Sequence, residues 1–271
     1  MRSNQFRLLK AEFLKTKGTS IFIFHLSLAI ISVGSLFIYF FFKTRQELLN
    51  EKLFEANPNP WFIYYGNYLF LFVIFLPVII SVTAFLVKNI EDRADGWKRL
   101  YVLPYGIETL HVAKLLIIIT YVTIYLLATY FLLSISSFIL AEFKSDFEFH
   151  HFNPLTYNIF ILFVKFEIAA VSIVTFSYAL FISLKRNTAS LLISIFLPFF
   201  GLTFTSQYSS PFNQWTSYTS KRTHMIINSI QGYDDLKIAL VDKYDIINLL
   251  VLIISLCIIV YASKKPIISY E

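Results

Sequence analysis

Six long apolar runs alternate with short polar segments along this chain, and this alternation is its dominant pattern. The runs cover residues 19–42, 62–87, 112–140, 155–184, 189–204 and 246–262. A helix needs about 20 apolar residues to cross the hydrocarbon core of a bilayer. The pattern therefore predicts an all-α integral membrane protein with six transmembrane helices. The fifth run is short and contains Pro198 and Gly201, so five or seven spans stay open.

Composition changes this picture by excluding a soluble protein. The 271 residues are 57% hydrophobic and 15% charged, and the mean hydropathy is +0.65. Soluble domains carry about a quarter charged residues and lack apolar runs of this length. The first run is too long for a signal-peptide core, so we expect it to be a retained helix. Residues 1–271 are thus expected to form one transmembrane domain.

The distribution of Lys and Arg predicts the orientation of the chain. If the N-terminus is inside, the inner segments hold 14 Lys or Arg and the outer segments hold 8. Cytoplasmic segments carry the excess of these residues in membrane proteins. Both termini and the segment 88–111 are therefore predicted to be cytoplasmic, and 205–245 extracellular. This topology accounts for the net charge of +6 without nucleic-acid binding.

Residues 1–18 have the pattern of a basic amphipathic helix. Their apolar side chains recur at helical spacing, and basic side chains occupy much of the remaining surface. Such a helix lies in the membrane interface. The apolar positions are Phe6, Leu9, Phe13 and Leu14, and the residues expected to matter at the interface are Leu9, Glu12, Phe13 and Lys15. A positively charged flank with accidental periodicity is the alternative.

The polar segment between the second and third runs is the most unusual part of the chain. It packs seven charges and a Trp into a short stretch. The sequence predicts a short helix between Asn89 and Leu103, which Pro104 ends. Asn89 is a plausible N-cap, and Trp97 lies in a small apolar patch within a charged rim. This composition favours a docking surface over a plain connecting loop, which stays the alternative.

These features resemble the membrane subunits of type-2 ABC exporters, small six-span permeases. The resemblance rests on the N-terminal helix, the long loop after the second run, the pattern Glu91…Gly96-Trp97-Lys98…Pro104…Lys114, and the long segment before the last run. In that family the loop carries a coupling helix that fits a groove on a separate ATPase. The coupling role is thereby assigned to Glu91, Asp92, Gly96, Trp97, Lys98 and Pro104.

The resemblance also implies the partners and the setting of the protein. It implies a separate ABC ATPase that binds ATP and Mg²⁺, and a second permease chain that forms a homodimer or heterodimer with this one. It implies a multi-pass protein of the bacterial plasma membrane and export of an amphipathic, peptide or lipidic substrate. Several bacterial permeases of this size belong to bacteriocin (lantibiotic) immunity systems, and this group is an expectation here.

The sequence contains no ATP-binding motif of the phosphate-loop type. None of its seven glycines begins a G-x-x-x-x-G-K-[ST] phosphate loop, so no cofactor is expected in this chain. His150 and His151 lack the H-E-x-x-H spacing of a zinc site, so no metal is expected. No catalytic constellation is visible, and the protein is predicted not to be an enzyme.

Three ionisable residues within the runs are candidates for a pathway or subunit interface. Lys165 and Glu167 lie two residues apart in the fourth run and point in different directions on a helix. Such groups are costly in a membrane and usually face a cavity or partner. A snorkelling Lys165 with a neutralised Glu167 is the alternative. His25, in the first run, is better explained by an interhelical hydrogen bond than by proton transfer.

Two further classes of function stay open at this point. One is a membrane-embedded enzyme, such as a peptidase or a lipid-modifying protein, which would need paired catalytic residues at equal depth. The other is a non-transporting membrane sensor or immunity protein, whose deletion would not abolish ATP-dependent efflux.

Overall fold

The structure is a computed structural model, and it describes residues 2–17, 19–49, 59–93, 106–152, 154–184, 187–203 and 243–264. Throughout these ranges the regular elements are helices. They are α1 (Arg2–Lys17), α2 (Ile21–Phe42), α3 (Arg45–Leu49), α5 (Pro60–Arg93), α7 (Ile107–Phe143), the 3₁₀ helices η1 (Ser145–Phe147) and η2 (Phe149–His151), α8 (Thr156–Ser183), α9 (Asn187–Thr203) and α12 (Lys243–Lys264). The predicted all-α membrane fold is confirmed.

Each of the predicted spans falls on one of these helices. Among the described residues, four helical stretches are long and apolar enough to cross a membrane: Ile21–Phe42, Ile107–Phe143, Ile159–Ser183 and Ile246–Ser263. Shorter apolar stretches, Phe75–Ile90 and Asn187–Phe196, lie in α5 and α9. Helix α9 continues through Pro198 and Gly201 to Thr203. The six-span count and the orientation stay predictions.

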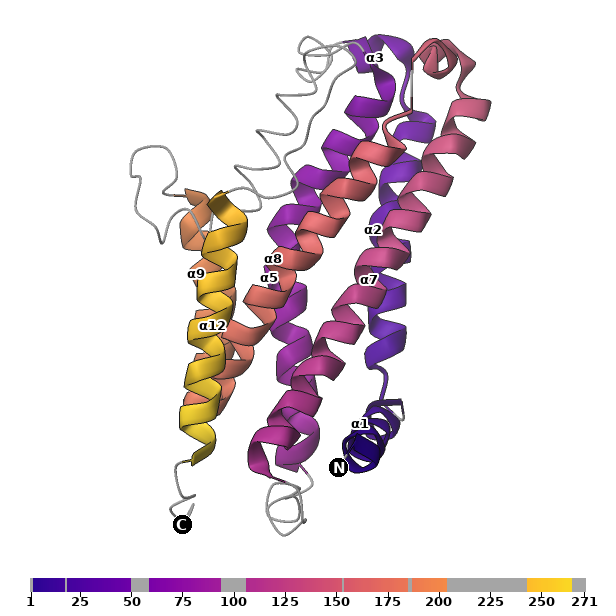
Figure 1. Ribbon diagram of the computed structural model, residues 1–271. Coiled ribbons are helices and arrows are strands. Elements are labelled where there is room, and N and C mark those ends of the chain that lie inside the picture. Colours follow the sequence, from indigo (N-terminus) through magenta and orange to yellow (C-terminus); the bar gives the residue numbers. More distant parts are fainter. Residues whose placement is uncertain are drawn as a thin grey trace.

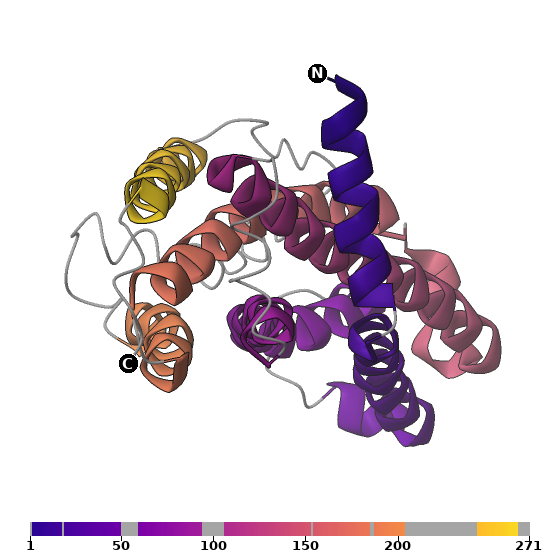
Figure 2. The ribbon, with the colours of Figure 1, turned by 90° about the horizontal axis from the view of Figure 1, so that it is seen from below.

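The long helices run side by side as a bundle, and α1 lies across one end of it (Figure 1). Seen along the bundle, α5 occupies the middle, with α2, α7, α8 and α9 around it (Figure 2). Helix α12 packs chiefly on α8 at the margin. We refer to the two ends of the bundle as the α1 end and the α3 end.

Aromatic side chains fill the interior at the contacts of α5. Tyr64, Tyr65 and Tyr125 are all buried, and their rings supply large contact areas between neighbouring helices. The Tyr65 hydroxyl lies 2.9 Å from the Ser137 hydroxyl of α7, which satisfies both polar groups inside the bundle. Such hydrogen bonds between helices supplement packing where lipid surrounds the protein.

Helices α5 and α7 extend beyond the apolar runs that predicted them. At 34 and 37 residues they are about 51 and 56 Å long at 1.5 Å per residue, against a hydrocarbon core of about 30 Å. The prediction that Asn89 begins a new helix is wrong, because Asn89 lies within α5, which continues to Arg93. The predicted docking segment therefore starts on the end of the second span.

Candidate functional site

The ends of several helices gather with α1 at the α1 end of the bundle. Helix α5 ends there at Arg93, α7 begins at Ile107 and α9 begins at Asn187 (Figure 1). The chain between Arg93 and Ile107 carries most of the predicted coupling residues, and in the sequence it joins α5 to α7. Two polar clusters join the elements at this end.

The first cluster is a buried ion pair between α1 and α7. The Lys114 ammonium donates to Glu12 Oε2 at 2.8 Å, and the side chains of Lys114 and Glu12 are only 1% and 4% exposed. The other carboxylate oxygen of Glu12 accepts a hydrogen bond from the half-exposed Lys15 at 2.6 Å. A buried carboxylate is tolerated only when its charge is paired and its oxygens are hydrogen-bonded. Glu12 meets both conditions.

Further contacts hold the C-terminal part of α1 against α7, next to the start of α2. The Tyr121 hydroxyl of α7 donates to Thr16 Oγ1 at 2.9 Å, and the Thr19 hydroxyl donates to the Thr16 carbonyl at 2.6 Å. The ring of Phe13 stacks on Tyr121 with centroids 6.5 Å apart. These contacts fix the turn between α1 and α2 against α7.

The face of α1 that packs on the bundle differs from its predicted apolar face. Leu8, Glu12 and Thr16 are buried at intervals of one helical turn, whereas Phe13 is 41% exposed and Leu14 is 55% exposed. Leu9 is half-buried beside Leu8. The sequence could not reveal this, because a buried polar stripe looks like a solvated one until its partner is known. The interfacial role of the exposed apolar residues stays a prediction.

The second cluster ties the end of α5 to the start of α9. The Lys88 ammonium donates to Asp92 Oδ2 at 2.8 Å and to Asn187 Oδ1 at 2.5 Å, and Asn187 Nδ2 donates to Asp92 Oδ2 at 2.6 Å. The three side chains thus form a closed ring of charge-assisted hydrogen bonds. This ring connects the helix that leads into the predicted coupling segment with a helix that is distant in the sequence.

We expect Asn187→Leu to break this ring and to lower the free energy of unfolding by about 1 kcal/mol, because the lost hydrogen bonds are partly exposed to solvent. Thr188→Ala is the matched control, since Thr188 is the adjacent exposed residue of the same helix. Denaturant unfolding of the purified protein in detergent micelles measures both. Equal stability of the two variants would show that the ring contributes nothing.

The predicted coupling residues are placed only in part. Asp92 lies in the ring just described, and Glu91 belongs to the last turns of α5. Gly96, Trp97, Lys98 and Pro104 lie outside the described residues. The coupling role of all these residues stays a prediction.

The three ionisable candidates within the spans lie in separate places. His25 Nδ1 donates to the Ile21 carbonyl at 2.7 Å, and its Nε2 lies 2.8 Å from Thr83 Oγ1 of α5. Lys165 of α8 is only 3% exposed, which does not favour snorkelling. Glu167 Oε1 accepts a hydrogen bond from Thr123 of α7, while its Oε2 is buried without a hydrogen-bond partner among the described residues. The pathway or interface role of these three side chains stays a prediction.

Within the described part of the chain, no group of three His, Cys, Asp or Glu side chains is placed to hold a metal ion. The chemistry of the α1 end is accordingly that of ion pairs and hydrogen bonds between helices. Such contacts position helices relative to one another.

The bundle of apolar helices is that of an integral membrane protein. Helix α1 lies across one end of the bundle and is joined to α7 there by the buried Glu12–Lys114 ion pair. The chain belongs to the ABC-2 family of transporters, since the family model described as "ABC-2 family transporter protein" matches residues 8–201. It is therefore a membrane permease component of an ABC transporter, a family that implies a partner ATPase. A search of curated proteins found no match, and a search of solved structures found none either.

The sequence did not reveal which side chains pair with one another at the α1 end. Lys114 was visible as a charge that interrupts the third apolar run, and Glu12 as the acidic residue of a basic helix. These two isolated, opposite charges were the available signal. Asn187 gave no comparable signal, because a neutral amide at a helix start is a common N-cap.

Proposed function

We propose that this chain is the membrane subunit of an ATP-driven exporter, and that a separate ATPase docks on the α1 end of the bundle. The observation that supports this proposal is the buried Glu12–Lys114 pair at 2.8 Å, which attaches α1 to α7 beside the predicted coupling segment. A docked ATPase would thus meet several helices that are joined to one another.

In this proposal, the helices that continue from the coupling segment share a force applied to it. The segment continues directly into α5 at Arg93 and into α7 at Ile107. From α7 the Glu12–Lys114 pair leads to α1, and from α5 the Asp92–Asn187 hydrogen bond leads to α9. In the proposed mechanism, ATP-driven closure of two ATPases displaces this connected set of helix ends and shifts the bundle.

The remaining parts of the proposal concern the substrate and the assembly. We infer a cytoplasmic α1 end from the charge distribution, and a second permease chain that completes the pathway in a bacterial plasma membrane. The substrate is proposed to be amphipathic, either a peptide such as a bacteriocin or a lipid-like molecule. The many aromatic side chains are compatible with either substrate.

Co-purification tests the docking assignment. The full chain, tagged and expressed in its own cells, is expected to retain an ABC ATPase, and Trp97→Ala or Glu91→Ala is expected to weaken the association roughly thirtyfold if either is a docking hot spot. Efflux or substrate resistance of the cells should fall in parallel.

Arg45→Ala is the control for this experiment, because Arg45 is half-exposed at the α3 end and forms an ion pair with Glu148 at 2.6 Å. It should leave the association unchanged. The coupling assignment is wrong if Trp97→Ala and Glu91→Ala retain the ATPase and the resistance as well as Arg45→Ala does. The exporter proposal itself fails if the unsubstituted chain retains no ATPase.

A further inference from the structure

The outer surface of α1, away from the bundle, combines positive charge with exposed apolar side chains. Arg7 and Lys10 are exposed, and Phe13 and Leu14 are 41% and 55% exposed. Glu12 is the only acidic residue of α1, and its carboxylate is buried in the ion pair with α7. Among the described residues, neither Arg7 nor Lys10 has an ion-pair or hydrogen-bond partner. No acid therefore offsets the charge of this surface within α1.

Helix α1 lies where the lipid-facing surfaces of its neighbouring helices begin. Val112 and Leu116 of α7 flank Lys114, and they are 50% and 47% exposed. Ile23, in the first turn of α2, is 67% exposed. Exposed apolar side chains on spanning helices face hydrocarbon, so the hydrocarbon core begins beside α1. The headgroup layer extends about 5–7 Å beyond that core, and α1 therefore lies at its level.

The orientation of α1 brings part of it outside the bundle. Figure 1 shows α1 lying across the end of the bundle, and in the view along the bundle its N-terminal end extends past the outline of the other helices (Figure 2). Leu8 and Thr16 are buried on the packed side of α1, whereas Lys10 and Phe13 are exposed. The packed side is thus occupied by protein, and the outer surface is left for the lipid headgroups next to the bundle.

Anionic headgroups match this outer surface better than zwitterionic ones. A Lys or Arg close to an anionic bilayer surface is attracted to it, which corresponds to about a fivefold gain in association for each cation. Arg7 and Lys10 are three residues apart and therefore neighbours on the helix surface, as are Lys10 and Leu14 at four residues. Cations with apolar side chains between them are typical of helices that lie in a bilayer interface.

We propose that the outer surface of α1 binds the headgroups of anionic phospholipids, with Arg7 and Lys10 at their phosphates. The apolar side chains of Phe13 and Leu14 insert among the same lipids. Because the opposite side of α1 is fixed to α7 by a buried ion pair, these lipids bind a helix that is attached to the bundle. This role of α1 goes beyond ATPase docking and does not depend on the exported substrate.

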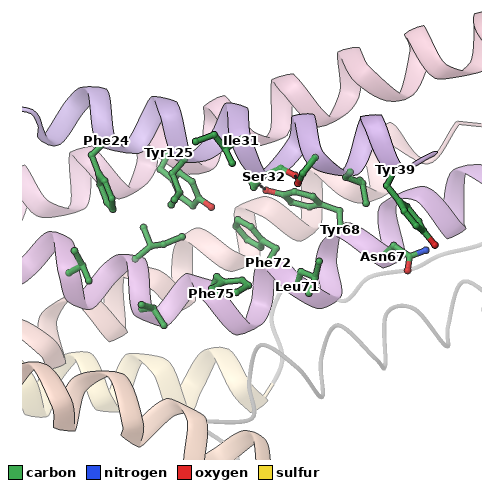
Figure 3. Close-up of a pocket in the computed structure, with 16 residues that line it drawn as sticks. Phe24, Ile31, Ser32, Tyr39, Asn67, Tyr68, Leu71, Phe72, Phe75 and Tyr125 are labelled. Carbon is green, nitrogen blue, oxygen red and sulfur yellow. Dashed lines mark hydrogen bonds between the residues drawn. The ribbon is translucent and has the colours of Figure 1, made fainter. Parts of the chain in front are cut away.

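The groove between α2 and α5 provides an uncharged reference surface on the same protein (Figure 3). Its volume is about 700 Å³, and the described residues that line it include no Lys, Arg, Asp or Glu. Ile31 and Phe75 line it and are 66% and 56% exposed, so they also face lipid in a membrane. Lipid contacts at these residues are expected to follow the composition of the bilayer, without a preference for charge.

Photocrosslinking of the full chain in phosphatidylcholine nanodiscs tests the proposal. Phosphatidylglycerol and phosphatidylcholine probes that carry the same acyl diazirine are added in equal small amounts, and their adducts are mapped by mass spectrometry. The measured quantity is the yield of the phosphatidylglycerol adduct divided by that of the phosphatidylcholine adduct. We expect this ratio to be roughly thirtyfold higher on the α1 peptide than on the peptide that contains Ile31, about fivefold for each cation.

Substitutions of the two cations assign the preference to them. Lys10→Gln should lower the ratio on α1 about fivefold, and Arg7→Gln together with Lys10→Gln should lower it to the value at the groove. Lys10→Arg is the matched control, because it keeps the charge and should keep the ratio. Sodium chloride at about 1 M should lower the ratio on α1 alone, because salt screens attraction between exposed charges. Both cations are exposed, so these substitutions leave the packed side of α1 unchanged.

Equal ratios on α1 and at the groove would overturn the proposal, and so would a high ratio on α1 that survives the double substitution. If the ratios are equal and the double substitution instead releases the ATPase from the chain, the outer surface of α1 contacts the ATPase, which also overturns lipid binding. Retention of the ATPase by the unsubstituted chain tests the exporter proposal separately, so the two failures are distinguishable.

Discussion

Replacing Glu12 by Gln is expected to lower the free energy of unfolding by about 3–5 kcal/mol, because it leaves the Lys114 ammonium buried without its carboxylate. Lys114 is only 1% exposed, so water cannot replace the lost partner. Denaturant unfolding of the purified chain in detergent micelles measures this loss. Lys114→Met should cost less, since Glu12 would keep its hydrogen bond from Lys15.

Two further variants separate the buried pair from other effects of charge removal. The double variant Glu12→Gln with Lys114→Met should recover most of the stability, because neither charge then remains buried. Lys15→Ala should cost less than about 1 kcal/mol, since Lys15 is 39% exposed and its ion pair is screened by solvent. If Glu12→Gln costs no more than Lys15→Ala, the pair does not hold α1 on the bundle.

Replacing Trp61 by Ala is expected to cost about 3–5 kcal/mol at the opposite end of the bundle, because it removes a large buried ring and a buried donor together. Trp61 is 3% exposed, and its ring lies 5.0 Å from Phe149 and 5.3 Å from Phe138. Its Nε1 donates to the Phe149 carbonyl at 3.0 Å. Hydrogen exchange of the η2 amides should accelerate together with the loss of stability.

Trp61→Phe and Phe143→Ala serve as comparisons at the same end. Trp61→Phe keeps a ring but loses the donor to Phe149, so it should cost about 1–2 kcal/mol. Phe143 is 71% exposed, and Phe143→Ala should change stability little. Equal effects of Trp61→Ala and Phe143→Ala would show that Trp61 does not anchor η2.

The positions of the membrane helices follow from the sequence because of one strong physical requirement. A backbone in hydrocarbon must satisfy its hydrogen bonds internally, so each long apolar run has to be a helix. The ends of those helices follow less well. Helix α5 continues to Arg93 because Lys88, Glu91 and Arg93 are of types that form helices well after the chain leaves the apolar region. A change in polarity therefore marks where hydrocarbon ends and does not mark where a helix ends.

The candidate site was predicted as a location and only partly as a set of contacts. The charges around Asp92 pointed to the C-terminal end of α5, which is where the cluster lies. Asn187, the hydrogen-bond partner of Asp92, lies 95 residues away in the sequence. The apolar stripe of α1 was visible, whereas the packed face of α1 is the stripe of Leu8, Glu12 and Thr16. Helical periodicity describes the faces of a helix and contains no information about which face meets a neighbour.

The sequence by itself determined that this protein is an all-α membrane protein, that a charged segment follows its second apolar run, and that it resembles ABC-2 permeases. These features depend on composition and local order along the chain. Only the tertiary structure decided that Glu12 meets Lys114, that Asp92 meets Asn187, and that α2 and α5 enclose a groove. Those features depend on which helix faces adjoin, and that is set by packing among residues far apart in the sequence.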